Sequence, residues 1–134
     1  MNGQNLLVEE GRVTGIIDFN DTIFMPYAFD ISVLAAYIGS NVLDAFEGGS
    51  DVELKYHEAI TNIVEGYRLG AKTETVLDEL RSSMFSFMVM RLSQSIVNGL
   101  QMVEKEPENE EYFLIDARPA IRHLKFLMTR QTIF

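Results

Sequence analysis

Residues 5–30 place the strongest constraint on how this chain folds. They contain two short apolar runs joined by a turn with a glycine, a pattern typical of a β-hairpin with strands at 5–10 and 12–18. Asn5 opens the first strand and Asp18 closes the second, so we expect both at the same end of the hairpin. Amide and carboxylate oxygens are ligands that suit Mg²⁺. This end of the hairpin is therefore a candidate magnesium site.

The rest of the chain predicts helices. Residues 19–27 lack periodicity and contain Pro26, so we expect a loop, and the almost wholly apolar run 28–39 predicts a buried helix followed by a flexible connector at 41–50. A capping-box pattern at 50–53 begins a further helix that ends near residue 70. Helices are also expected at 76–80, 82–104, 112–115 and 120–128. The fold class is thus mostly α with a small β-hairpin (α+β), in one domain over 1–134 with hairpin and metal loop at 5–27 and a helical part at 28–134.

Composition excludes several classes of function. The 134 residues are 47% hydrophobic and 23% charged, as in a globular domain, and no cysteine is present for a disulfide, a thiolate zinc site or a thiol nucleophile. A net charge of −9 argues against nucleic acid, and it either attracts a cationic substrate or simply maintains solubility. With no membrane-length apolar run and no signal peptide, we expect a cytoplasmic protein that does not bind a membrane.

Several other polar residues allow two interpretations. Arg91, Gln94 and Ser95 either face a cleft or form a buried polar network among the methionines of the 82–104 helix. His57 and His123 have no partner at the spacing of a zinc pair, so packing at the surface or in the core is expected for both.

Three short motifs, in order, resemble the catalytic core of the aminoglycoside phosphotransferase and choline kinase-like group, which shares the protein-kinase fold. Asn5 matches the last position of H-G-D-x-x-x-x-N, residues 17–19 match I-D-F, and residues 30–32 match D-[LI]-[AS]. An acid at Asp21 and the tracts at 91–97 and 107–112 are most similar to the hydroxylysine kinase-like members of that group. The resemblance covers the C-terminal lobe of the kinase-like fold.

The resemblance implies roles for the residues of the motifs. Asn5 and Asp18 would bind Mg²⁺, and Asp30 would anchor the catalytic loop from below. Asn20 and Asp21 would contact metal or substrate. The residues alone also allow other interpretations. Asn5 and Asp18 then are ordinary turn and strand-end residues, Asp30 is a helix cap, and Asn20 and Asp21 are solvated loop residues.

The implied activity is transfer of the γ-phosphoryl group of ATP or GTP, with Mg²⁺, to a hydroxyl of a small amine-bearing molecule that is hydroxylysine-like or aminoglycoside-like. Counted back from Asn5, the catalytic Asp of the motif falls one residue before Met1, so no catalytic residue is assigned and we expect the 134 residues alone to be inactive. One alternative is a non-catalytic remnant that binds a ligand or partner, with self-association through the apolar face that the missing N-terminal lobe leaves exposed. The other is a helical structural domain with a chance I-D-F.

Overall fold

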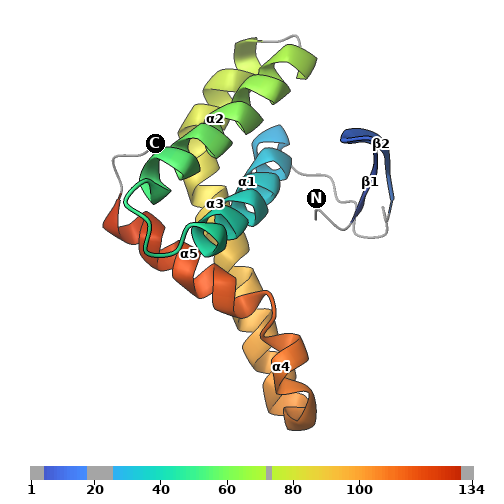
Figure 1. The fold of residues 1–134 in the computed structure, drawn as a ribbon, viewed down its shortest axis with the longest axis vertical. Helices are drawn as coiled ribbons and strands as arrows, with labels where there is room; N and C mark the ends of the chain where they lie inside the picture. The colour runs from blue at the N-terminus through green and yellow to red at the C-terminus, as the bar shows by residue number, and fades with distance from the viewer. Residues whose placement is uncertain (1–4, 18–25, 72–73, 131–134) are drawn as a thin grey trace.

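The computed structural model describes residues 5–17, 26–71 and 74–130, and it confirms a mostly helical protein with a small β-hairpin (Figure 1). The elements in chain order are strands β1 (Leu6–Glu9) and β2 (Arg12–Ile16), helices α1 (Tyr27–Ala45), α2 (Val52–Ala71) and α3 (Glu74–Lys105), the short 3₁₀ helix η2 (Pro107–Asn109), and helices α4 (Glu110–Phe113) and α5 (Ala117–Thr129).

The hairpin forms because the chain reverses at residues that adopt the left-handed region. Glu10 and Gly11 have φ angles of 48° and 74°, and the strands then pair antiparallel with Leu6 opposite Ile16. At the open end, the Ile17 N–H donates to the Asn5 carbonyl oxygen at 2.9 Å. Asn5 and Ile17 therefore lie side by side, as the hairpin pattern predicts.

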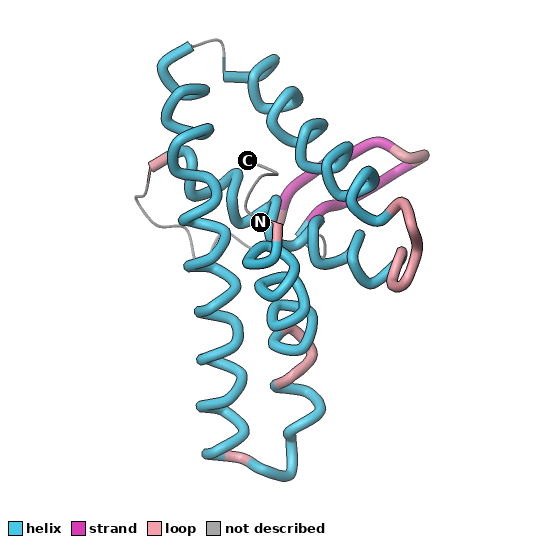
Figure 2. Tube along the Cα trace, turned by 90° about the vertical axis from the view of Figure 1, so that its left-hand side faces the viewer, coloured by secondary structure: helices cyan, strands magenta, loops and turns pink. Residues whose placement is uncertain are grey.

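Helix α1 is the centre of the helical part, where α2, α3 and α5 all pack against it (Figure 1). Its buried face is made largely of small residues, which allow the neighbouring helices to approach closely. These residues are Ala28, Ser32, Ala35, Ala36, Gly39 and Ser40. Large side chains from the surrounding helices, including Tyr56, Leu80, Met88 and Leu127, complete the core. Figure 2 shows α3 as the longest helix, with the chain turning back along its C-terminal half.

Two predicted helix boundaries are wrong. Helix α1 continues to Ala45 through the expected connector, because Ser40 and Leu43 extend its buried face beyond Gly39. The helices expected at 76–80 and 82–104 are one continuous helix, α3. Leu80, Met84 and Met88 follow one another at four-residue spacing and are all buried, so a single helical face spans the expected break.

Other expectations are confirmed. Met84 and Met88 are core residues, whereas Met90 is 43% exposed. The helical pattern of α3 ends before Pro107, which begins the 3₁₀ helix η2. In the described ranges, no helix combines the length and the apolar character that crossing a membrane requires.

Candidate functional site

The predicted magnesium site lies partly outside the described residues. Asn5 is half-buried at the open end of the hairpin, but Asp18, Asn20 and Asp21 all fall in the range 18–25, which the structure does not describe. Among the described residues, no group of three or more His, Cys, Asp or Glu side chains is placed to hold a metal ion. The amide oxygen of Asn5 and the carboxylate of Asp18 are ligand types that suit Mg²⁺ by their chemistry. The pair therefore stays a prediction.

Asp30 lies where the sequence places it, in the first turn of α1. It is exposed there, and the N-cap position of the helix is occupied by Pro26. A carboxylate near the N-terminus of a helix interacts favourably with the helix dipole. The anchoring role that the resemblance implies for Asp30 stays a prediction.

A pocket of about 250 Å³ opens between α1, α3 and the start of α5. Its apolar walls come from residues such as Ala36, Leu92 and Pro119. Its polar side chains are Tyr37, Ser40, Asn41, Asp44, Arg91, Ser95 and Asp116. Apolar walls with a few polar groups are typical of small-molecule sites, although this pocket is smaller than the ~300–1,000 Å³ of most such sites.

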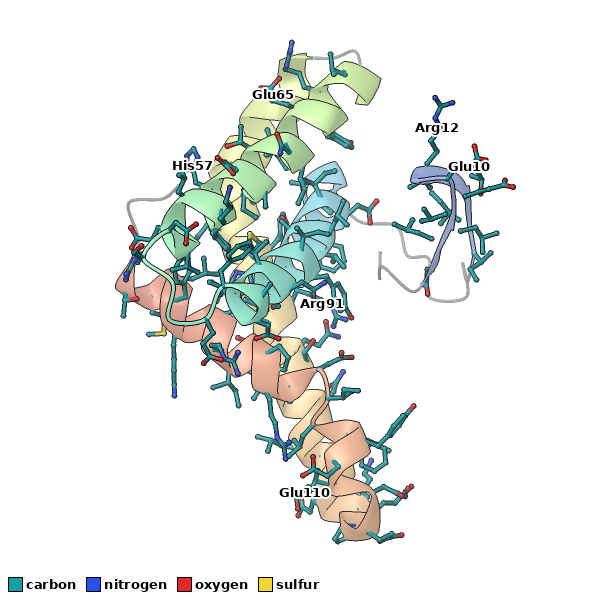
Figure 3. All side chains as sticks on the ribbon, in the orientation of Figure 1. Glu10, Arg12, His57, Glu65, Arg91 and Glu110 are labelled. Carbon is teal, nitrogen blue, oxygen red and sulfur yellow. The ribbon has the colours of Figure 1, made fainter. Side chains whose placement is uncertain are left out.

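Arg91 joins two walls of this pocket. Its Nη2 donates to the Tyr37 hydroxyl at 2.7 Å, and the guanidinium carbon lies 5.4 Å from the centre of the Tyr37 ring. The hydrogen bond and the cation–π contact fix a long side chain against α1. Figure 3 shows Arg91 beside α1 on the side of the helices where the hairpin lies.

The acidic side chains of the pocket differ in their partners. Asp44 accepts a hydrogen bond from Arg122 Nη1 at 2.5 Å, and the same nitrogen lies 3.2 Å from Glu47. Asp116 occupies the N-cap position of α5, and its side chain makes no cap hydrogen bond. Both carboxylates are exposed, so they can meet a ligand that enters from solvent.

A buried polar cluster supports the pocket wall at Ser40. His123 Nδ1 lies 3.1 Å from the Ala36 carbonyl oxygen and 3.0 Å from Ser40 Oγ, and His123 Nε2 lies 2.7 Å from the Tyr56 hydroxyl. Burial lowers the pKa of His123 to about 4, against a smaller opposite effect of the Ala36 hydrogen bond, and burial raises the pKa of Tyr56. The cluster is therefore neutral near pH 7 and links α1, α2 and α5.

Sequence reasoning located only part of this site. Arg91 and Ser95 line the pocket, whereas Gln94 is exposed and is not among its lining residues. His123 is a core residue and His57 is exposed, so each fits one of the two kinds of packing expected for both. Tyr37, Asn41 and Asp44 were not predicted, although their spacing of four and then three residues forms a polar stripe on a largely apolar helix.

Residues 1–58 match the phosphotransferase enzyme family. The chain is 28% identical to hydroxylysine kinase of Xenopus laevis, with 95% of this chain and 33% of the relative aligned. For the hydroxylysine kinases of Mus musculus and Danio rerio the identity is 27%, with 95% and 94% of this chain and 32% and 33% of the relatives aligned.

These matches confirm the resemblance inferred from the three motifs, and the hairpin followed by helices is the arrangement that the resemblance implies. The chain spans about one third of the length of these curated relatives. No solved structure matches it.

Proposed function

We propose that this chain forms part of a small-molecule kinase that transfers the γ-phosphoryl group of ATP or GTP to a hydroxyl of a small amine-bearing substrate. The observation that carries the proposal is the similarity to proteins named hydroxylysine kinase along 95% of the chain, hairpin and helices together. The molecule that accepts the phosphoryl group is then hydroxylysine-like or aminoglycoside-like.

The hairpin end is the proposed metal site. Phosphoryl transfer requires that charge on the phosphates be neutralised, and a bound Mg²⁺ supplies that neutralisation. Asn5 and Asp18 would hold the ion, with Asn20 and Asp21 beside it and Asp30 anchoring the catalytic loop. The half-buried Asn5, whose carbonyl accepts from Ile17, supports this placement because the hydrogen bond joins Asn5 to the residue that directly precedes Asp18 in the sequence.

The pocket between α1, α3 and α5 is the proposed acceptor site. Asp44 and Asp116 are exposed carboxylates at its rim, where they can attract an ammonium group. The acceptor hydroxyl also needs a base. No residue that matches the family motifs within 1–134 has that role, so we expect these residues alone to bind ligands without turnover.

The test begins with sequencing of the transcript upstream of the Met1 codon. If the reading frame continues into His-Gly-Asp, its product is assayed for phosphorylation of hydroxylysine with Mg²⁺ and ATP. Asp18→Asn should lower kcat by about 100-fold or more, because the metal loses its carboxylate. The control Asp51→Asn changes an exposed carboxylate in the turn before α2 and should retain activity. A stop codon directly upstream, or full activity in Asp18→Asn, would contradict the proposal.

The exposed apolar side chains of the hairpin favour a second candidate function. Leu7, Val8, Val13, Ile16 and Ile17 are between 42% and 61% exposed. A cluster of this kind commonly marks a surface that contacts another protein. In this second candidate the chain is non-catalytic and binds a partner or a second copy of itself through the hairpin.

A further inference from the structure

Arg91 is the only cation among the described side chains that line the pocket. Within the part of the chain that the structure describes, it forms no ion pair with a carboxylate. The other arginines whose side chains are described in the helical part all do, namely Arg68, Arg118, Arg122 and Arg130. Arg91 is also less exposed than these four. A charge held partly away from water without a counter-ion is unfavourable, and a bound anion would offset that cost.

The shape of the Arg91 side chain indicates which anion fits. The guanidinium is a planar group with five N–H donors, and its fork matches two oxygens of a carboxylate or of a phosphate, so the other groups of the pocket must distinguish between them. One of these donors bonds to the Tyr37 hydroxyl. The guanidinium carbon of Arg91 also lies over the Tyr37 ring, 5.4 Å from the ring centre. Tyr37 therefore orients the guanidinium before a ligand arrives, which lowers the entropy cost of binding.

The pocket also holds a negative charge that is separate from Arg91. Asp116 lines the same pocket, its carboxylate caps no helix N–H, and it forms no ion pair with Arg91 within the described residues. Separate positive and negative groups in one small pocket fit a ligand that carries both a carboxylate and an ammonium group. A polycationic aminoglycoside has no carboxylate to place against Arg91.

We propose that Arg91 is the carboxylate anchor of the acceptor site, and that it selects a hydroxylated amino acid over an aminoglycoside. This inference rests on the proposed function, because it treats the pocket as the site of the phosphoryl acceptor. It adds a specificity-determining residue and one substrate class to that function. Asp116 binds the ammonium group of the same ligand.

The first test uses the wild-type 134-residue chain and removes the negative charge from the ligand. Binding of hydroxylysine is measured by ¹H–¹⁵N NMR titration beside its methyl ester, its decarboxylated diamino alcohol and kanamycin. We expect the amino acid to bind about tenfold or more tightly than the ester or the diamino alcohol, the effect of one charge-assisted hydrogen-bonded pair. The net charge of −9 favours the more cationic ligands, so this order of affinity requires a local cation.

The second test removes the anchor from the protein. Arg91→Gln should abolish the preference for the amino acid over its ester, and Tyr37→Phe should weaken it, because the guanidinium loses its fixed partner. The matched control is Arg68→Gln, which removes an exposed arginine of α2 and should leave the preference unchanged. The comparison of ligands on the wild-type chain decides the proposal even if a variant fails to fold.

The role of Arg91 as anchor would be overturned by equal affinity for acid and ester, by tighter binding of kanamycin, or by an unchanged preference in Arg91→Gln. The proposed function, with an amine-bearing substrate, would be unaffected by these results. If no ligand shifts the amide signals of the pocket, the pocket is not the acceptor site and the inference fails. The Asp18→Asn activity assay judges the proposed function separately, since it does not depend on how the acceptor is bound.

Discussion

The proton on the His123 ring is assigned by its neighbours. The Ala36 carbonyl oxygen can only accept, so Nδ1 carries the hydrogen at 3.1 Å, and Nε2 accepts from the Tyr56 hydroxyl at 2.7 Å. Ser40 donates to the same carbonyl at 2.9 Å, which completes the cluster. Each buried polar side chain that the structure describes then has a partner. Protonation of Nε2 would place a second donor against the tyrosine in a buried site.

Folding stability should therefore depend on the titration of His123. Its pKa is about 4 in the folded chain and its ordinary value is 6.5, so between these values the unfolded chain binds more protons. The free energy of unfolding should fall as pH drops through this window, by about 2 kcal/mol between neutral pH and about pH 5. Urea unfolding at several pH values measures the slope, and NMR titration of the imidazole gives its pKa directly.

Two variants separate this effect from general acid sensitivity. His123→Gln should lose the slope in the window between pH 4 and 6.5, and His57→Gln, which changes an exposed histidine on α2, should keep it. An imidazole signal of His123 that titrates near its ordinary value of 6.5 would contradict the assignment of a buried neutral ring.

The close approach of α1 to α2 and α5 depends on Gly39. A Cβ at this position would lie 2.6 Å from Cε1 of His123 and 2.7 Å from Cε2 of Tyr56, and both rings are fully buried. The rings have no space into which they can move, so Gly39→Ala should destabilise the fold by about 1–3 kcal/mol. Urea denaturation measures the change.

Gly66→Ala is the matched control for Gly39→Ala, because it also replaces a helical glycine and its Cβ would meet nothing within 4 Å. It should stabilise the chain by up to about 1 kcal/mol, through helix propensity alone. Similar effects of the two substitutions would show that packing at Gly39 does not limit the approach of the helices.

Periodicity predicted the helices better than it predicted their ends. Gly39 reads as a helix stop in the sequence, yet in the structure it is the point where two buried rings meet the α1 backbone. The break expected near Ser82 fails for a related reason, since Leu80 and Met84 lie on one buried face. At Gly39, tertiary packing overrides local propensity, and a single sequence carries no direct sign of it. At the expected break near Ser82, the four-residue spacing of the buried residues was visible in the sequence.

The motifs located the hairpin end, but sequence order alone could not assemble the pocket. Arg91 and Tyr37 are 54 residues apart, and Asp116 comes from a third helix. Their meeting depends on how α3 and α5 cross α1, which no spacing along the chain encodes. The polar stripe on α1 was visible in the sequence. That it lines a pocket could be seen only once α3 and α5 were placed beside it.

Most residues of the hairpin are exposed, and its exposed valines lead to a prediction about the whole chain. Val8 and Val13 are cross-strand partners, 61% and 58% exposed. If this face contacts a second copy, the mass by light scattering should rise with concentration. Replacing both by Thr keeps strand propensity and should weaken association about tenfold, because apolar contact area is lost.

Val97→Thr provides a matched control, since Val97 is 50% exposed but lies on α3. It should leave self-association unchanged if the hairpin is the contact surface. The net charge of −9 opposes association of like chains, so added salt should strengthen the wild-type dimer by screening that repulsion. A constant monomer mass at every concentration and salt level would contradict self-association through the hairpin, and with it the form of the second candidate function in which the partner is a second copy.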